Sequence, residues 1–245
     1  MKILNLGCGH KVSAHLDIVN IDWSMHLRIR KSRLLSLLAP MVLSPARRKR
    51  LSDLPANIMA HDLSLGIPFA DSSVDAIFHS NMLEHLDRDV APLFLTEALR
   101  VLKPGGIHRI VVPDFELSCT RYLAHIASCE LDPQLQPQHD DYIAQVLEQS
   151  VRREAAGTRL QSPLGRVIDK TLLGDARKRG ETHQWMYDRI SLATLLRRLG
   201  YTDVRLLRHD SSGIVNWPQY GLDVNPDGSE YAPGSLYMEA RKQAT

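Results

Sequence analysis

Cysteine is scarce in this chain, and long apolar runs are missing from it. Only three cysteines occur among 245 residues, at Cys8, Cys119 and Cys129. Their spacing matches neither a zinc motif nor an even set of disulfides, so we expect a reducing, cytoplasmic location. No run of 18 or more apolar residues occurs, and Lys2 leads directly into a short apolar strand. We therefore expect neither a membrane-spanning helix nor a secretory signal.

Acidic residues are absent between Trp23 and Ser52, although the chain as a whole carries a net charge of only +2. The same stretch holds a set of basic residues: Arg28, Arg30, Lys31, Arg33, Arg47, Arg48, Lys49 and Arg50. A local basic block of this kind favours a specific anionic partner over general affinity for nucleic acid. Three interpretations of segment 28–50 stay open: a solvated helical hairpin, a cap over an acceptor, or a contact with an anionic membrane surface or a lipid-linked glycan. The last would place the protein peripherally at the inner membrane face. The oligomeric state stays open.

Short apolar runs alternate with helical patterns along the chain. The predicted strands are Lys2–Leu6, Asp17–Ile21, Asn57–His61, Asp75–His79, Ile107–Val112, Asp203–Arg208 and Ser235–Arg241; the predicted helices are Asp89–Leu102, ended by Lys103-Pro104-Gly105-Gly106, and Ile190–Leu199, capped by Asp188 and ended by Gly200. This alternation predicts an α/β fold with a parallel sheet. We expect a single domain, 1–245, with helical insertions at 23–55 and 115–187 over the carboxyl edge of the sheet, the second as an acceptor-side cap.

Polar landmarks follow the first three predicted strands. The turn Gly7-Cys8-Gly9 lets a ligand approach the main chain, but Val12 stands where a dinucleotide motif needs its third glycine. Asp22 ends the second strand, where a carboxylate can bind a ribose diol. Asp62 ends the third, where it can accept a hydrogen bond from an adenine amino group. Asp22 or Asp62 alone would be an ordinary loop residue. The glycine turn followed by both acids, each at the end of its own strand, favours a nucleoside cofactor.

Several segments together resemble a known enzyme family. "LNLGCGH", "NIDWS", "HDLSLGIPFADSSVDAIFHSNMLEHL" and "EALRVLKPGGIHRIVVPD" resemble class I S-adenosylmethionine-dependent methyltransferases of type 11. "HQWMYDRISLATLLRRLGY" and "SLYMEARK" resemble a bacterial subgroup associated with surface-polysaccharide synthesis. The resemblance implies a Rossmann-like, seven-stranded, mostly parallel sheet with helices on both faces. It also implies S-adenosyl-L-methionine as the cofactor and methylation of a sugar or glycan hydroxyl.

The resemblance also assigns cofactor-binding residues. Gly7 and Gly9 would lie under the methionine portion, Asp22 would hold the ribose, and the adenine would meet Asp62 and the backbone of Leu63. The full set is Asn5, Gly7, Cys8, Gly9, Asp22, Trp23, Asp62, Leu63, Ser80 and Asn81. The chain departs from the family at Asn5, where an acid is common, and at Lys11, where a third glycine is common. The short interval between Gly9 and Asp22 predicts that the first crossover helix is abbreviated or replaced by a loop.

Methyl transfer to a hydroxyl needs alignment and benefits from a general base. The candidates are His85 after the fourth strand, Asp114 at the end of the fifth, and His183 in "ETHQWMYD". Each has a structural alternative: a packed histidine, a helix cap, and an anchor that works with Trp185 and Tyr187. We interpret Glu84 as structural.

The histidines and carboxylates lack metal-ligand spacing, and so no required metal is predicted. Other acceptors stay open, including a natural product or an amine, as does a cofactor-binding scaffold without catalysis. The fourth strand ends in "SNML" and not in the Asn/Asp-Pro-Pro-aromatic signature of adenine methylation, which disfavours nucleic acid.

Overall fold

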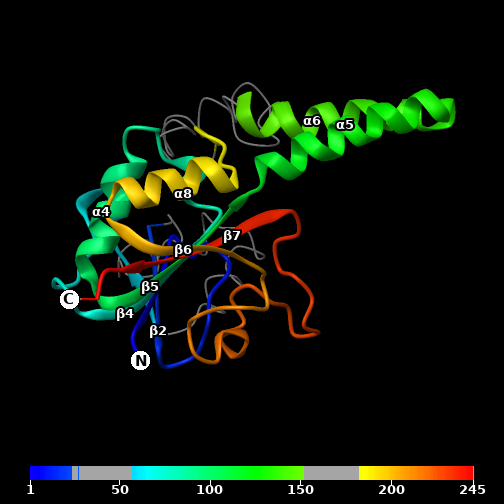
Figure 1. Ribbon diagram of the computed structural model, residues 1–245. Helices are drawn as coiled ribbons and strands as arrows, with labels where there is room; N and C mark the ends of the chain where they lie inside the picture. The colour runs from blue at the N-terminus through cyan, green and yellow to red at the C-terminus, as the bar shows by residue number, and fades with distance from the viewer. Residues whose placement is uncertain (24–26, 28–56, 152–181, 245) are drawn as a thin grey trace, which may run out of the picture.

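One sheet organises the protein. The computed structural model describes residues 1–23, 27, 57–151 and 182–244. The strands are β1 (Ile3–Leu6), β2 (Ile18–Asp22), β3 (Ile58–Ala60), β4 (Val74–Ser80), β5 (Leu102–Pro113), β6 (Tyr201–Leu207) and β7 (Ser235–Lys242). They form a seven-stranded sheet in the order β3-β2-β1-β4-β5-β7-β6, in which β7 runs antiparallel to both of its neighbours (Figure 1). The predicted Rossmann-like, mostly parallel sheet is confirmed.

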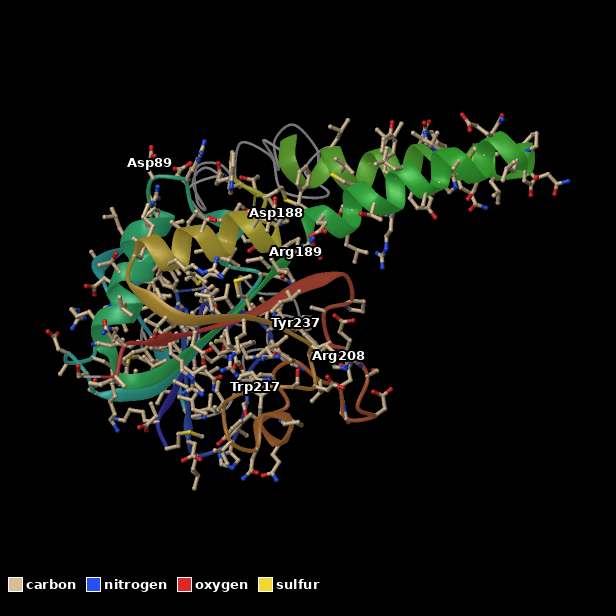
Figure 2. The ribbon with its side chains drawn as sticks, in the orientation of Figure 1. Asp89, Asp188, Arg189, Arg208, Trp217 and Tyr237 are labelled. Carbon is tan, nitrogen blue, oxygen red and sulfur yellow. The ribbon has the colours of Figure 1, made fainter. Side chains whose placement is uncertain are left out.

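Two helices cover one face of the sheet. Helix α4 (Ala91–Val101) buries residues three or four positions apart, among them Phe94, Leu95 and Ala98, as an amphipathic helix does. Helix α8 (Arg189–Arg198) begins at a capping box in which the side chain of Asp188 accepts from the backbone N–H of Ser191. Figures 1 and 2 show both helices on the same side of the strands, with Asp188 and Arg189 at the start of α8. The predicted cap is confirmed.

The opposite face is covered by the connection from β6 to β7. Its short 3-10 helix η5 (Trp217–Tyr220) packs Trp217 against Phe78 of β4 at 5.1 Å between ring centroids. Arg109 of β5 is fully buried beneath this connection. Its Nε donates to Asp223 at 2.5 Å and its Nη1 to Glu239 at 2.8 Å. Figure 2 shows Trp217 and Tyr237 on this side of the sheet; the rings lie 5.1 and 5.6 Å from the guanidinium.

Strand β5 starts earlier than the sequence predicts. It begins at Leu102, so the Lys103–Gly106 segment belongs to the strand and does not form a separate stop between helix and strand. The reason lies at Gly106, where a Cβ atom would sit 2.8 Å from the carbonyl oxygen of Lys103. The chain can turn tightly there and continue into the sheet, and a register shift between Val74 and Ala76 on β4 accommodates it.

A loop replaces the first crossover helix, as predicted. Residues 7–17, all within the described chain, form turns and extended chain. Buried amides hold them in place: Asn5 Nδ2 donates to Asn20 Oδ1 at 2.8 Å and to the carbonyl of Lys11 at 2.9 Å. Asn20 in turn donates to the carbonyl of Ser13 at 2.9 Å and to Asn57 Oδ1 at 3.1 Å. These side chains satisfy backbone groups that a helix would otherwise pair.

The second predicted insertion is helical from Phe115 to Val151, whereas its described end, residues 182–187, is not helical. Helix α5 (Phe115–Leu131), the 3-10 helix η3 (Pro133–Gln138) and helix α6 (His139–Val151) form a hairpin. In Figure 1 the hairpin extends away from the sheet instead of lying across it, and only the start of α5 adjoins β5. Residues 152–181 lie outside the described residues, as does insertion 23–55 apart from Trp23 and Leu27. The cap over the acceptor therefore stays a prediction. No helix in the described part is long and apolar enough to cross a bilayer.

Candidate active site

The turn after β1 lies beside the end of β2. The parallel register pairs Leu6 with Ile21, which brings Gly7 to Gly9 next to Asp22. Gly7 and Gly9 have φ values of 60° and 49°, a backbone region that favours glycine. The backbone N–H of Gly9 donates to Asp22 Oδ2 at 2.6 Å. The predicted glycine turn and the predicted ribose-binding carboxylate are thus in direct contact.

Gly7 also contacts the loop after β4. A Cβ atom at Gly7 would lie 2.7 Å from Sδ of Met82, so any side chain there would displace that loop. Asn81 takes a left-handed conformation with φ 49°, and its N–H donates to the carbonyl of Val111 at 2.9 Å. This turn carries the chain out of Ser80, the last residue of β4, and over the carboxyl end of β5. No sequence pattern indicates this role of Met82, because only the fold brings it to Gly7.

Two predicted cofactor residues are buried. Burial, with a smaller effect from Asp22, raises the pKa of the Cys8 thiol to about 12, so Cys8 is a neutral thiol. Asn5 is 1% exposed, and its amide donates both bonds that fix the loop. The departure from an acid at this position therefore has a structural use. Trp23, by contrast, is 47% exposed at the end of β2.

The end of β3 completes the edge. Asp62 caps the 3-10 helix η1 (Leu63–Leu65), accepting from the backbone N–H of Ser64 at 3.0 Å. The backbone N–H of His61 donates to the carbonyl of Asp22 at 3.1 Å, which holds the ends of β2 and β3 together. The sequence-predicted cofactor residues therefore come from four neighbouring strands and meet at one edge, where open α/β sheets bind ligands.

His85, His183 and Glu84 form a cluster beyond β4. Glu84 and His85 belong to the 3-10 helix η2 (Leu83–His85). His183 comes from the segment that leads into α8, and that segment is pinned by a bond from the backbone N–H of Gln184 to the carbonyl of Glu84 at 2.7 Å. The two imidazole rings meet edge to face at 4.7 Å between centroids. Ligand atoms of the three side chains lie within 4.8 Å of one another, so the cluster could hold a cation. The sequence pattern did not predict this grouping.

The hydrogen bond of His85 fixes its tautomer. Its Nδ1 lies 3.2 Å from the carbonyl oxygen of Thr182, which only accepts, so Nδ1 carries the proton and Nε2 keeps a lone pair. Burial lowers the pKa of His85, against an opposing effect of the Thr182 carbonyl. A neutral imidazole with an available lone pair is the form that a general base requires.

Glu84 is the unusual member of the cluster. Its side chain is fully buried, and neither carboxylate oxygen has a hydrogen-bond partner among the described residues. Its Oε1 lies 3.8 Å from Nε2 of His85, beyond hydrogen-bond range. Burial raises the pKa of Glu84 to about 8, so its neutral form predominates at neutral pH. The sequence indicated a structural role for Glu84 but not this isolation.

The other candidates have structural contacts. Asp114 caps α5, accepting from the backbone N–H of Leu117 at 3.2 Å, and burial raises its pKa. Tyr187 is 3% exposed within the core, which fits the anchor interpretation. Trp185 is 39% exposed and packs against the guanidinium of Arg88 at 4.4 Å. The structure therefore brings His85 and His183 together and places Asp114 at the adjacent end of β5.

The strand order, the glycine turn and the acidic strand ends are those of the class I, S-adenosylmethionine-dependent methyltransferase fold. Residues 4–110 match the family described as "Methyltransferase domain". S-adenosylmethionine is accordingly the cofactor, and the edge built from Gly7, Asp22 and Asp62 fits it. The acidic side chain and the main-chain turn that a ribose and a methionine portion require are both present.

Solved structures resemble the chain only distantly. A methyltransferase of Thermotoga maritima, described as a possible histamine N-methyltransferase, is 15% identical; the match covers 99% of this chain and 82% of that one, with a TM-score of 0.43. A methyltransferase of Methanosarcina mazei is 17% identical over 100% of this chain and 93% of that one, also at 0.43. No curated protein matches the chain.

Proposed function

We propose that the chain transfers a methyl group from S-adenosylmethionine to a hydroxyl of a sugar or glycan. The observation that carries the proposal is the state of His85. Its Nδ1–H is held by the carbonyl of Thr182, which leaves the Nε2 lone pair for a proton. His85 follows Met82, which packs on the glycine turn, by only three residues. A base at this place suits a hydroxyl, which is a poor nucleophile until its proton leaves.

The cofactor supplies an electrophilic methyl group on a sulfonium, whose departure needs no proton. The residues of the chain have two tasks: Asp22 and the Gly7–Gly9 turn position the cofactor, and His85 accepts the acceptor's proton. With the cofactor bound, Nε2 of His85 would accept the proton that the acceptor hydroxyl loses as it takes the methyl group, and the sulfonium would leave as a neutral thioether. Most of the remaining rate enhancement comes from alignment.

Two features support a carbohydrate acceptor. The sequence from His183 to Tyr201 resembles a subgroup associated with surface polysaccharides. The same segment carries Trp185, an indole that is 39% exposed and can stack on a sugar ring. An amine acceptor or another small molecule is the alternative that the experiment below must separate. Association of segment 28–50 with an anionic membrane or a lipid-linked glycan stays a proposal, since that segment lies outside the described residues.

Replacement of His85 tests the proposal. After a screen of sugars, nucleotide sugars and lipid-linked glycans with radiolabelled cofactor, His85→Ala should lower kcat for the best hydroxyl acceptor by about 10²–10⁴-fold. Binding of S-adenosylhomocysteine, measured by calorimetry, should change by less than about twofold, because His85 acts on the acceptor. The acid limb of the wild-type kcat profile should lie below pH 6.5, since burial lowers the pKa of His85.

The control is His209→Ala, which alters a partly exposed histidine outside this edge. It should leave kcat and cofactor binding unchanged. Turnover only with amines would refute the assignment of a hydroxyl acceptor. Full activity of His85→Ala would show that another residue is the general base. Cofactor binding without turnover on any acceptor would instead favour a cofactor-binding scaffold without catalysis.

A further inference from the structure

Among the described residues, the hairpin of α5 and α6 has no core of fully buried apolar side chains. The only buried side chain of α5 is His125, at 8% exposure, and none of the described side chains of α6 is buried. Leucines that could have packed between the helices are instead exposed: Leu123 is 63% exposed, Leu131 88% and Leu147 53%. Two short helices with a polar seam need some other contribution to stay paired, because isolated helices of this length are marginal in water.

Imidazoles and a thiol occupy the seam in place of leucines. His125 and Cys129 are four residues apart on α5, and therefore on one helix face. His139 is the first residue of α6 and faces them across the turn. Nδ1 of His125 lies 3.1 Å from Nδ1 of His139 and 3.4 Å from Sγ of Cys129. All three potential ligand atoms lie within 4.8 Å of one another.

These distances match a metal coordination shell. Bonds of about 2.0–2.1 Å to nitrogen and about 2.3 Å to sulfur place the ligands of a tetrahedral zinc ion about 3.3–3.6 Å apart. The separations of His125 Nδ1 from His139 Nδ1, 3.1 Å, and from Cys129 Sγ, 3.4 Å, fall within a few tenths of an ångström of that range. Without a metal, the separation between His125 Nδ1 and His139 Nδ1 is that of an N–H···N hydrogen bond, so the two imidazoles are held together in either state.

Space for a fourth ligand adjoins the cluster. A cavity of about 320 Å³ is lined by Cys129 and His139 together with the carboxylate residues Glu130 and Asp140. A water molecule or one of these carboxylates can complete a tetrahedron from this side. The rings also brace the ligands: His125 stacks on Tyr142 at 3.9 Å between centroids, and His139 on Tyr122 at 5.6 Å.

We propose that His125, Cys129 and His139 bind a zinc-class divalent ion that clips α5 to α6. One thiolate and two imidazoles are the ligand chemistry that zinc favours, and Mg²⁺ or Ca²⁺ would prefer a set of oxygens. The ion closes the turn between the helices and replaces the missing apolar core. It belongs to the hairpin and takes no part in methyl transfer.

Cobalt substitution in the full-length protein tests this site. Metal-free protein titrated with Co²⁺ should take up one equivalent and develop tetrahedral d–d bands together with a thiolate-to-cobalt charge-transfer band, and Zn²⁺ should abolish both. Cys129→Ser should remove the charge-transfer band and weaken zinc binding at least about tenfold, because metal affinity here depends on a deprotonated thiol. Zinc should also raise the thermal midpoint of the wild-type protein but not of Cys129→Ser.

Cys119→Ser is the matched control, since it changes the other cysteine of the same helix; it should bind cobalt like the wild type. Cys8 is a neutral buried thiol and should not contribute. No cobalt uptake, uptake without the charge-transfer band, or a band that persists in Cys129→Ser would each overturn the proposal. Uptake without that band would point instead to Glu84, His85 and His183, which offer no sulfur.

Discussion

A single carboxylate, Asp22, connects the end of β2 to the glycine turn that follows β1. It accepts the backbone N–H of Gly9 at 2.6 Å and so holds the glycine turn, and we propose that it also binds the ribose. This double use explains why the turn can do without a following helix: a side chain from β2 supplies the acceptor for a turn amide. The same carboxylate is therefore expected to matter for the shape of the turn and for cofactor binding.

Replacing Asp22 should separate these two uses. Asp22→Ala should weaken S-adenosylhomocysteine binding by about 1–3 kcal/mol, because a ribose hydroxyl loses its partner. Asp22→Asn keeps an oxygen for the Gly9 N–H and should fall between the alanine variant and the wild type. Calorimetry on both variants measures the loss. Asp71→Ala removes an exposed carboxylate that pairs with Arg100 and should bind like the wild type. Unchanged affinity in Asp22→Ala would refute the ribose assignment.

Sequence reasoning works at this scale when the signal lies next to the strand. Gly7 and Asp22 are identifiable because each follows a short apolar run, and Gly9 because it completes the Gly-x-Gly turn. Met82 and Thr182 are not, because Met82 meets Gly7 across 75 residues of chain and Thr182 meets His85 across a comparable distance. Glu84 illustrates the same limit: its identity suggests a surface residue, and only the fold reveals that it is fully buried.

Among the elements, the connection from β6 to β7 depends on one buried cation. Arg109 donates to the carbonyl oxygens of Arg208 and Ser211 at 2.8 Å and to two carboxylates. Trp217 Nε1 donates to the same Asp223 oxygen at 2.9 Å. The contacts of Arg109 with this connection cross about a hundred residues of sequence, and so no local pattern could predict them. The strands themselves were predictable, because their apolar runs reflect burial within a parallel sheet.

Removing one of the two carboxylates should lower the free energy of unfolding, because the buried guanidinium of Arg109 is then only partly neutralised. Asp223→Ala should lower the free energy of unfolding by about 3 kcal/mol, the low end for breaking a buried ion pair, because Glu239 still balances the charge of Arg109. Urea denaturation followed by tryptophan fluorescence measures it, since Trp217 loses its partner too. Asp223→Asn, which keeps an acceptor, should lose less.

Asp227→Ala offers a matched control in the same connection, because Asp227 is exposed and bonds with nearby Ser229. It should leave the urea midpoint nearly unchanged. Equal losses in Asp223→Ala and Asp227→Ala would mean that the connection is held by its backbone and not by Arg109.

At the scale of the whole molecule, the pKa values of the buried groups His79, His108 and Glu84 shift in opposing directions. Burial lowers the pKa of His79 to about 3 and that of His108 well below its usual 6.5, so both stay neutral in the folded protein. Burial raises the pKa of Glu84 from 4.5 to about 8. Amino-acid composition does not distinguish these buried residues from exposed residues of the same type. Their effect on stability follows only from where the fold buries them.

The stability of the protein should therefore peak near pH 6.5. Between about pH 4.5 and 6.5 the two histidines bind protons only when unfolded, whereas Glu84 binds one only when folded, so the unfolded state holds the net excess and stability rises with pH. Above pH 6.5 the histidine contribution is complete. Folded Glu84 still holds a proton that the unfolded chain has lost, and stability should fall by about 2 kcal/mol toward pH 8.

Glu84→Gln isolates the falling limb of this profile, because glutamine stays neutral and nearly isosteric with the protonated acid. Urea unfolding at half-unit steps from pH 5 to 8.5 should give a maximum for the wild type and a plateau above about pH 6.5 for Glu84→Gln. Glu97→Gln serves as the control: its carboxylate pairs with Arg100, which lowers its pKa, so it does not titrate in this range. The Glu97 variant should keep the wild-type maximum. A wild-type stability that rises steadily to pH 8.5 would mean that Glu84 is ionised in the folded protein, and that the cluster around His85 supplies a counter-charge for it.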